Sequence, residues 1–141
     1  MASMNPSDLP QGRDKRRLVL LVDDCLDSRE MYAEYLGDEF AIAQAGTGLE
    51  AIDQALALLP DVVVMDLTLP GMNGKEASVR LKRDPRTRLI PLVVVSGQEE
   101  PIEPHVKPTW DAFLSKPCRL SVLASEIRRA IDSTSSTAQN G

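Results

Sequence analysis

Five polar residues at the ends of short apolar runs have side chains suited to handling a phosphoryl group. They are Asp23, Asp24, Asp66, Ser96 and Lys116. Carboxylates held close together repel one another unless a cation neutralises them, and carboxylate oxygens completed by water and a phosphate are typical of a Mg²⁺ site. A carboxylate beside such an ion can attack phosphorus and form an acyl phosphate. A lysine and a hydroxyl on the other sides would bind the phosphoryl oxygens and neutralise their charge.

Considered alone, each of these residues also has an ordinary structural explanation. An aspartate after a strand is a common turn residue or helix cap, and Ser96-Gly97 is a common turn sequence. A single lysine such as Lys116 is usually a solvated surface residue. The placement of all five at the ends of predicted strands is what favours a functional site.

The apolar runs before these residues have the length and composition of buried strands. Three of the five are continuous rather than alternating, and valine dominates two of those, which is typical of strands covered on both faces of a parallel sheet. The runs are Leu18–Val22, Phe40–Ala43, Val62–Met65, Leu92–Val95 and Ala112–Leu114.

Amphipathic stretches separate the runs and predict helices between the strands. The first helix is expected to begin near Ser28, and the second at Thr47 with Glu50 as its capping-box partner. The third begins at Asn73-Gly74 and ends near Arg83. A final helix near the end of the chain contains Leu123, Ile127 and Ile131. Alternating strands and helices with right-handed crossovers predict an α/β fold with an open, doubly wound parallel sheet. Such a sheet gathers its functional residues just past the carboxyl ends of its strands.

Composition sets the limits of the domain and its surroundings. The chain has 141 residues and a formal net charge of −5, which argues against non-specific nucleic-acid binding. No apolar run approaches the roughly 20 residues that cross a bilayer. Two cysteines in a chain of this length favour a location in the reducing cytoplasm. Residues 1–15 and 133–141 are polar and are predicted to be disordered tails, leaving one domain at residues 16–132.

The sequence resembles the receiver domain of two-component response regulators. The resemblance implies a five-stranded parallel sheet in the flavodoxin-like order 2-1-3-4-5, with helices on both faces. The segments that carry it are LVLLVDDCLDSREM, VVVMDLTLPGMNG, LVVVSG and AFLSKP, in this order along the chain.

The resemblance also implies a role for each site residue. Asp66 matches the phosphorylated aspartate, and Ser96 and Lys116 match the hydroxyl and the lysine that bind the phosphoryl group. Asp23 and Asp24 match the acidic pair that binds Mg²⁺ together with Asp66 and the backbone carbonyl of Thr68. Phe113 matches the switch aromatic whose ring moves inward with the hydroxyl, and Lys116-Pro117 matches a cis peptide bond.

The segment between Ser96 and Lys116 departs from the family pattern. The family has a fourth helix there, but this chain has Pro101, Pro104 and Pro108. A proline in a helix interior costs about 3 kcal/mol or more, so the fourth helix is predicted to be shortened or missing.

The two cysteines also come at strand ends. Cys25 follows Asp24, and Cys118 follows Pro117. They are interpreted as small filler residues, with a redox pair as the alternative.

These features favour a stand-alone phosphorylation-dependent switch rather than a turnover enzyme. The predicted partners are a histidine kinase or phosphotransfer protein and a downstream protein, with Mg²⁺ as cofactor, no direct nucleic-acid contact and no membrane insertion. One alternative is a degenerate receiver that acts only as an interaction module. Another is a Mg²⁺-dependent aspartyl phosphatase or phosphotransferase of the haloacid-dehalogenase type, although the acidic pair of that family comes late in the chain.

Overall fold

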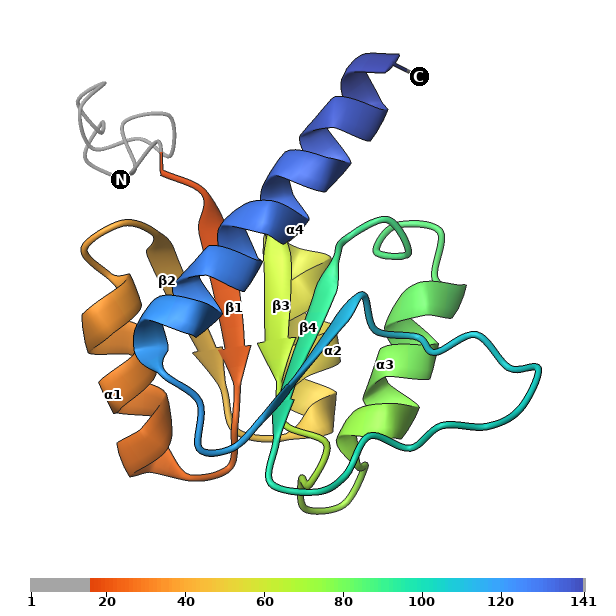
Figure 1. Cartoon of the computed structure of the whole chain (residues 1–141), viewed down its shortest axis with the longest axis horizontal. Coiled ribbons are helices and arrows are strands. Elements are labelled where there is room, and N and C mark those ends of the chain that lie inside the picture. The colour runs from red at the N-terminus through yellow and green to blue at the C-terminus, as the bar shows by residue number, and fades with distance from the viewer. Residues whose placement is uncertain (1–15, 141) are drawn as a thin grey trace, which may run out of the picture.

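The computed structural model describes residues 16–140, so the predicted N-terminal tail lies outside the described residues. Five parallel strands form one sheet in the order β2-β1-β3-β4-β5, which confirms the predicted α/β class and strand order (Figure 1). The strands are β1 (Leu18–Val22), β2 (Ala41–Ala45), β3 (Val62–Met65), β4 (Leu92–Ser96) and β5 (Ala112–Ser115). The helices are α1 (Leu26–Leu36), α2 (Gly48–Leu58), α3 (Gly74–Arg83) and α4 (Leu120–Asn140).

Helices cover both faces of the sheet, as predicted. The alternation of side chains along β4 illustrates the two layers, because successive residues of a strand point to opposite faces. Val94 packs in the core under α2 and α3, whereas Val93 and Val95 pack in the core under α1 and α4. The central strands β1, β3 and β4 are buried almost throughout, and this explains their continuous apolar sequences.

Two of the helices begin at the predicted cap residues. The Thr47 hydroxyl accepts a hydrogen bond from the backbone N–H of Glu50 (3.1 Å) at the start of α2. The Glu50 carboxylate reaches back to the N–H of Gly46 (3.3 Å) rather than to that of Thr47. The Asn73 side chain caps α3 by accepting from the N–H of Glu76 (2.8 Å).

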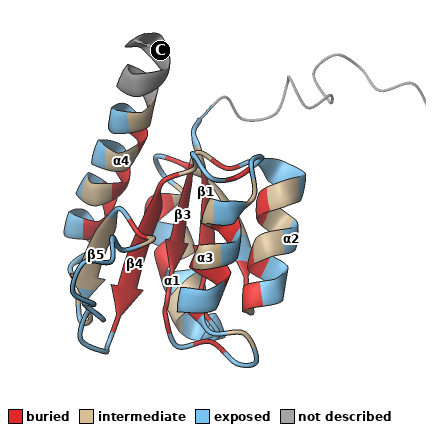
Figure 2. Cartoon of the chain, turned by 90° about the vertical axis from the view of Figure 1, so that its right-hand side faces the viewer, coloured by how far each residue is buried: buried red, intermediate tan, exposed pale blue. Residues whose placement is uncertain are grey.

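Residues 97–111, which we call the strap, connect β4 to β5 without a helix, as predicted from the three prolines. Most of the strap is exposed (Figure 2), and it runs outward past α3 before it returns to the sheet (Figure 1). Trp110, near its end, is only 7% exposed and belongs to the core under α2 and α3. A single aromatic side chain therefore joins the end of the strap to the core.

The end of the chain differs from the predicted boundary at residue 132. Helix α4 continues to Asn140 and so runs past that boundary. The segment contains no glycine or proline before residue 141, so nothing in its backbone stops the helix. Thr134 donates its hydroxyl hydrogen bond to the Ala130 carbonyl one turn earlier (3.1 Å). None of the described helices is long and apolar enough to cross a membrane.

Candidate functional site

Asp23 follows β1 directly and is held on both its backbone and its side chain. Its N–H donates to the Ala45 carbonyl of β2 (3.2 Å), and its Oδ1 accepts from the N–H of Cys25 (2.9 Å). The residue is 5% exposed, whereas Asp24 beside it is exposed. The pair therefore offers one buried and one solvent-facing carboxylate at the carboxyl edge of the sheet.

Asp66 occupies the equivalent place after β3. Its N–H donates to the Val22 carbonyl (3.0 Å), and its Oδ1 accepts from the N–H of Thr68 (2.9 Å). A Cβ at Gly74 would lie 2.2 Å from the Asp66 carbonyl oxygen. Only glycine therefore allows α3 to begin so close behind Asp66.

Lys116 joins these two loops. Its Nζ lies 2.8 Å from Asp66 Oδ2 and 3.2 Å from Asp23 Oδ2. Partial burial alone would lower the pKa of the ammonium by desolvating it, but the hydrogen bonds and negative charges of Asp66 and Asp23 outweigh this and raise the pKa well above its ordinary value. Lys116 is therefore a cation at neutral pH, next to both carboxylates.

The donor set at this edge fits a hard divalent cation. Asp23, Asp24 and Asp66 each offer a carboxylate oxygen, and these oxygens lie within 4.8 Å of one another. Lys116 supplies a single positive charge for this acidic cluster, so the cluster as a whole carries excess negative charge. Oxygen ligands of this kind, with one carboxylate open to solvent, suit Mg²⁺, which keeps several of its waters.

Ser96 is the last residue of β4, which pairs with β3, the strand before Asp66. It is fully buried, and its hydroxyl accepts a hydrogen bond from the N–H of Gln98 (3.1 Å). Its carbonyl accepts from the N–H of Lys116 (2.8 Å). The predicted hydroxyl and the predicted lysine are therefore adjacent through their backbones, and the hydroxyl also holds the first turn of the strap.

Phe113 and Thr68 have different surroundings. Phe113 is partly buried against the core under α2 and α3, and its ring lies 6.0 Å from that of Trp110 at an angle of 52°. Thr68 is exposed, and its N–H is the group that binds Asp66.

Lys116-Pro117 is a cis peptide bond, as the resemblance implied. The ligand role of the Thr68 carbonyl and the switch role of Phe113 stay predictions.

Sequence reasoning missed Arg29 of α1. Its guanidinium donates to the Asp23 carbonyl (2.6 Å) and to the side chain of Gln44 (3.0 Å), so it ties the loop after β1 to β2. An arginine on an amphipathic helix carries no signal of such a contact, because the contact depends on how the helix packs.

Sequence reasoning also missed the hydrogen bond between Trp110 and Glu100. The Trp110 indole N–H donates to Glu100 Oε2 (2.8 Å) across the strap. A tryptophan and a glutamate ten residues apart in an irregular segment have no periodic relation that would predict the bond.

Both cysteines are free. The hydrogen bond between the Cys25 thiol and the Ser28 side chain lowers the pKa of the thiol despite the nearby charge of Asp23. Burial raises the pKa of Cys118.

Comparison with known proteins identifies the family. The family model of the response regulator receiver domain matches residues 19–128. The chain belongs to this family. It is a receiver domain of two-component signalling, and this family assignment leaves the haloacid-dehalogenase alternative without support.

Curated relatives of this receiver differ in how much of their length it covers. It is 37% identical over 100 residues to the chemotaxis protein CheY of Halobacterium salinarum, an alignment that covers 70% of this chain and 83% of that protein. It is 40% identical over 98 residues to a protein-glutamate methylesterase/protein-glutamine glutaminase of Nitrosospira multiformis. That match covers 67% of this chain but only 26% of the larger protein. The chain therefore spans most of one relative and about a quarter of the other.

Solved structures agree with the fold. A sensor protein from Polaromonas sp. has a TM-score of 0.76 at 26% identity, with 84% of this chain and 98% of that chain covered. The chemotaxis response regulator CheY4 of Vibrio cholerae has a TM-score of 0.72 at 24% identity, with 82% and 99% covered. The receiver thus shares its overall fold with these solved structures.

Proposed function

We propose that this receiver accepts a phosphoryl group on Asp66 from a histidine kinase or a phosphotransfer protein and signals through contact with a downstream protein. The observation that carries the proposal is the position of the Lys116 ammonium, within hydrogen-bond distance of both Asp66 and Asp23. A nucleophilic carboxylate, a fixed cation and an acidic cluster at one edge supply the positioning and charge neutralisation that phosphoryl transfer needs.

The transfer itself is a displacement at phosphorus. A carboxylate oxygen of Asp66 forms the new P–O bond, while the P–N bond of a phosphohistidine breaks. The leaving imidazole keeps the electron pair and takes a proton from solvent. Lys116, already beside Asp66 Oδ2, stays bonded to the product and offsets the added negative charge.

Asp23, Asp24, Asp66 and the backbone carbonyl of Thr68 are the residues proposed to hold Mg²⁺. When bound, the ion neutralises charge on the phosphoryl oxygens during transfer. The buried Asp23 orients its carboxylate through the N–H of Cys25, and the exposed Asp24 leaves that side of the cluster open to water and donor.

Ser96 and Phe113 are proposed to read the phosphorylated state. The Ser96 hydroxyl turns from the N–H of Gln98 to a phosphoryl oxygen, and Phe113 moves further inward. Phe113 has no hydroxyl that would need a partner when the ring is buried. The receiver itself is proposed to act in the cytoplasm, without nucleic-acid contact and without turnover of an external substrate.

A second candidate is a receiver that serves only as an interaction module. The strap favours it, because the helix that the resemblance implied between β4 and β5 is missing among the described residues. Retention of Asp23, Asp24, Asp66, Ser96 and Lys116 favours the phosphorylated switch instead.

Phosphorylation with a small donor separates the two candidates. The protein is incubated with Mg²⁺ and acetyl phosphate, and its intact mass is measured. We expect the mass of one phosphoryl group in the wild type, its loss in Asp66→Asn, and its retention in Asp53→Asn, which removes an exposed carboxylate of α2. No gain with any donor would contradict the switch and favour the interaction module.

A further inference from the structure

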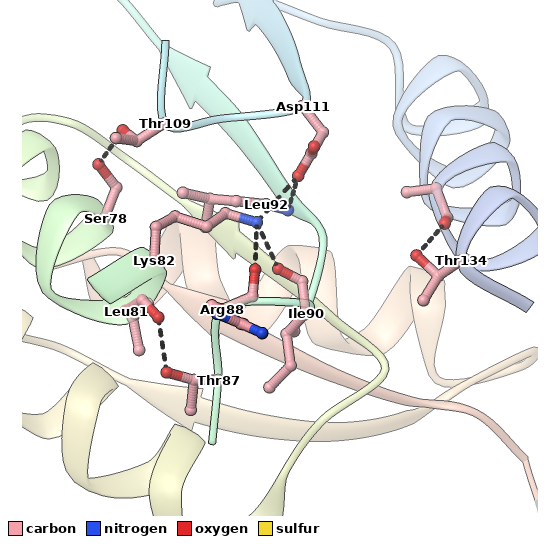
Figure 3. Close-up of polar contacts among 11 residues, drawn as sticks. Ser78, Leu81, Lys82, Thr87, Arg88, Ile90, Leu92, Thr109, Asp111 and Thr134 are labelled. Atoms are coloured by element: carbon pink, nitrogen blue, oxygen red, sulfur yellow. Dashed lines mark hydrogen bonds and ion pairs between the residues drawn. The ribbon is translucent and has the colours of Figure 1, made fainter. Parts of the chain in front are cut away.

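The strap is held in place by contacts of very different strength. Glu103 pairs with Lys75 of α3 (2.5 Å), but both side chains are about half exposed, and ion pairs of this kind contribute little. Thr109 is hydrogen-bonded to Ser78 (2.5 Å), and Asp111 accepts from the N–H of Leu92 (2.7 Å) (Figure 3). The far end of the strap is therefore anchored to α3 and β4.

The near end of the strap has fewer attachments. A Cβ added at Gly97 would meet nothing within 4 Å, so this residue is not packed against the fold. Among the described residues, the hydrogen bonds that restrain this end run from the Gln98 N–H to the Ser96 hydroxyl and from the Trp110 indole to Glu100. Glu99, between them, is exposed.

These two hydrogen bonds are closely linked along the chain. Gln98 and Glu100 are two residues apart, a separation of at most about 7 Å along the backbone. A movement of the Gln98 N–H away from Ser96 must therefore either change the backbone torsion angles at Glu99 or displace Glu100. Because Trp110 is buried beside Phe113, its indole cannot follow Glu100 without leaving the core.

We propose that the Glu100–Trp110 hydrogen bond is a latch that keeps the strap closed in the unphosphorylated receiver and opens when Ser96 turns toward the phosphoryl group. This inference rests on the function proposed above. Loss of the Ser96 acceptor frees the Gln98 N–H, and the near end of the strap then shifts and withdraws Glu100 from the indole. The strap, still held at its far end and by the exposed Glu103–Lys75 pair, changes the surface that it presents to a partner, including Ile102, which is 80% exposed.

Trp110 provides a direct readout, because it is the only tryptophan of the chain. Beryllofluoride, a mimic of the phosphoryl group, is titrated into the full chain in the presence of Mg²⁺ while tryptophan emission and its quenching by acrylamide are recorded. We expect emission to shift to longer wavelength and quenching to increase as the mimic binds. Asp66→Asn should abolish both changes.

Three variants test the latch itself. Glu100→Ala removes the acceptor and should raise the apparent affinity for beryllofluoride roughly fivefold, because less interaction has to be broken on activation. Glu100→Gln keeps an oxygen that can accept from the indole and should remain close to wild type. Glu99→Ala removes the same charge from the neighbouring exposed residue and should leave the affinity unchanged.

The possible failures are distinguishable. If the mimic binds but tryptophan emission does not change, and Glu100→Ala behaves like Glu99→Ala, the latch is wrong and the proposed function stands. If all three variants gain affinity equally, general removal of charge is responsible and the latch is also wrong. If neither beryllofluoride nor acetyl phosphate modifies the wild type, the proposed function fails and the latch fails with it.

Discussion

At the carboxyl edge of the sheet, Asp23 and Asp66 are buried, bonded to backbone N–H groups and joined by one lysine. The strap begins at the end of the neighbouring strand, yet most of its residues are exposed, and one buried side chain, Trp110, fixes it to the core. The first region has the residue types that the resemblance implied for the site, and the second has no helix among the described residues. The proposed phosphoryl site needs fixed geometry, whereas a surface proposed to signal to a partner needs two arrangements.

The largest effect should come from the apolar anchor of the strap. Trp110→Ala is expected to lower the free energy of unfolding by about 3 kcal/mol, because it leaves a cavity in the core under α2 and α3. Chemical denaturation with urea measures this. Trp110→Phe, which keeps an aromatic ring but loses the indole N–H, should recover most of the loss, and equal losses in both variants would show that the ring's burial is not what holds the strap.

A smaller effect is expected at the acidic cluster. With a chelator present to remove divalent cations, Lys116→Met should lower the free energy of unfolding by about 2 kcal/mol at neutral pH, because it leaves two buried carboxylates without their cation. The loss is smaller than for a fully buried ion pair, since the lysine side chain is 28% exposed. Lys107→Met, at an exposed lysine of the strap, is the matched control and should change stability by less than about 0.5 kcal/mol. If the two substitutions have equal effects, the contrast between the regions is wrong.

The same lysine should also give a pH dependence of stability. Its pKa is raised above the ordinary value of 10.5 in the folded protein, so its contribution is complete below that pH and is lost as the pH rises above it. The difference in unfolding free energy between wild type and Lys116→Met is therefore expected to be constant from pH 7 to about 10 and to shrink at higher pH. A difference that already shrinks between pH 7 and 9 would contradict the raised pKa.

The smallest effect is expected for the exposed ion pair of the strap. Its hydrogen bond to Lys75 lowers the pKa of Glu103, but solvent and salt screen an exposed pair strongly. Glu103→Gln should leave the urea midpoint at 0.15 M salt indistinguishable from wild type. A clear loss of stability that disappears in 1 M salt would mean that the strap depends on this pair more than on Trp110.

Much of the fold followed from local patterns. Continuous apolar runs located β1, β3 and β4, and the Thr47 and Asn73 caps located the starts of α2 and α3. The predicted second strand was displaced, because Phe40 is a buried residue before β2 rather than part of it. The predicted boundary at residue 132 falls inside α4, which continues to Asn140, because a polar sequence without an apolar face can still extend a helix that has already begun.

By itself, the sequence determined which chemical groups stand at the carboxyl edge, because a parallel sheet brings all strand ends of one kind to the same side. It also excluded a regular helix in the strap, since three prolines are a local steric constraint. Only the tertiary structure decided that Lys116 bonds both Asp23 and Asp66, that Arg29 supports the loop after β1, and that Trp110 turns into the core to meet Glu100. These contacts join residues on separate elements or across an irregular segment, so their existence depends on packing in three dimensions.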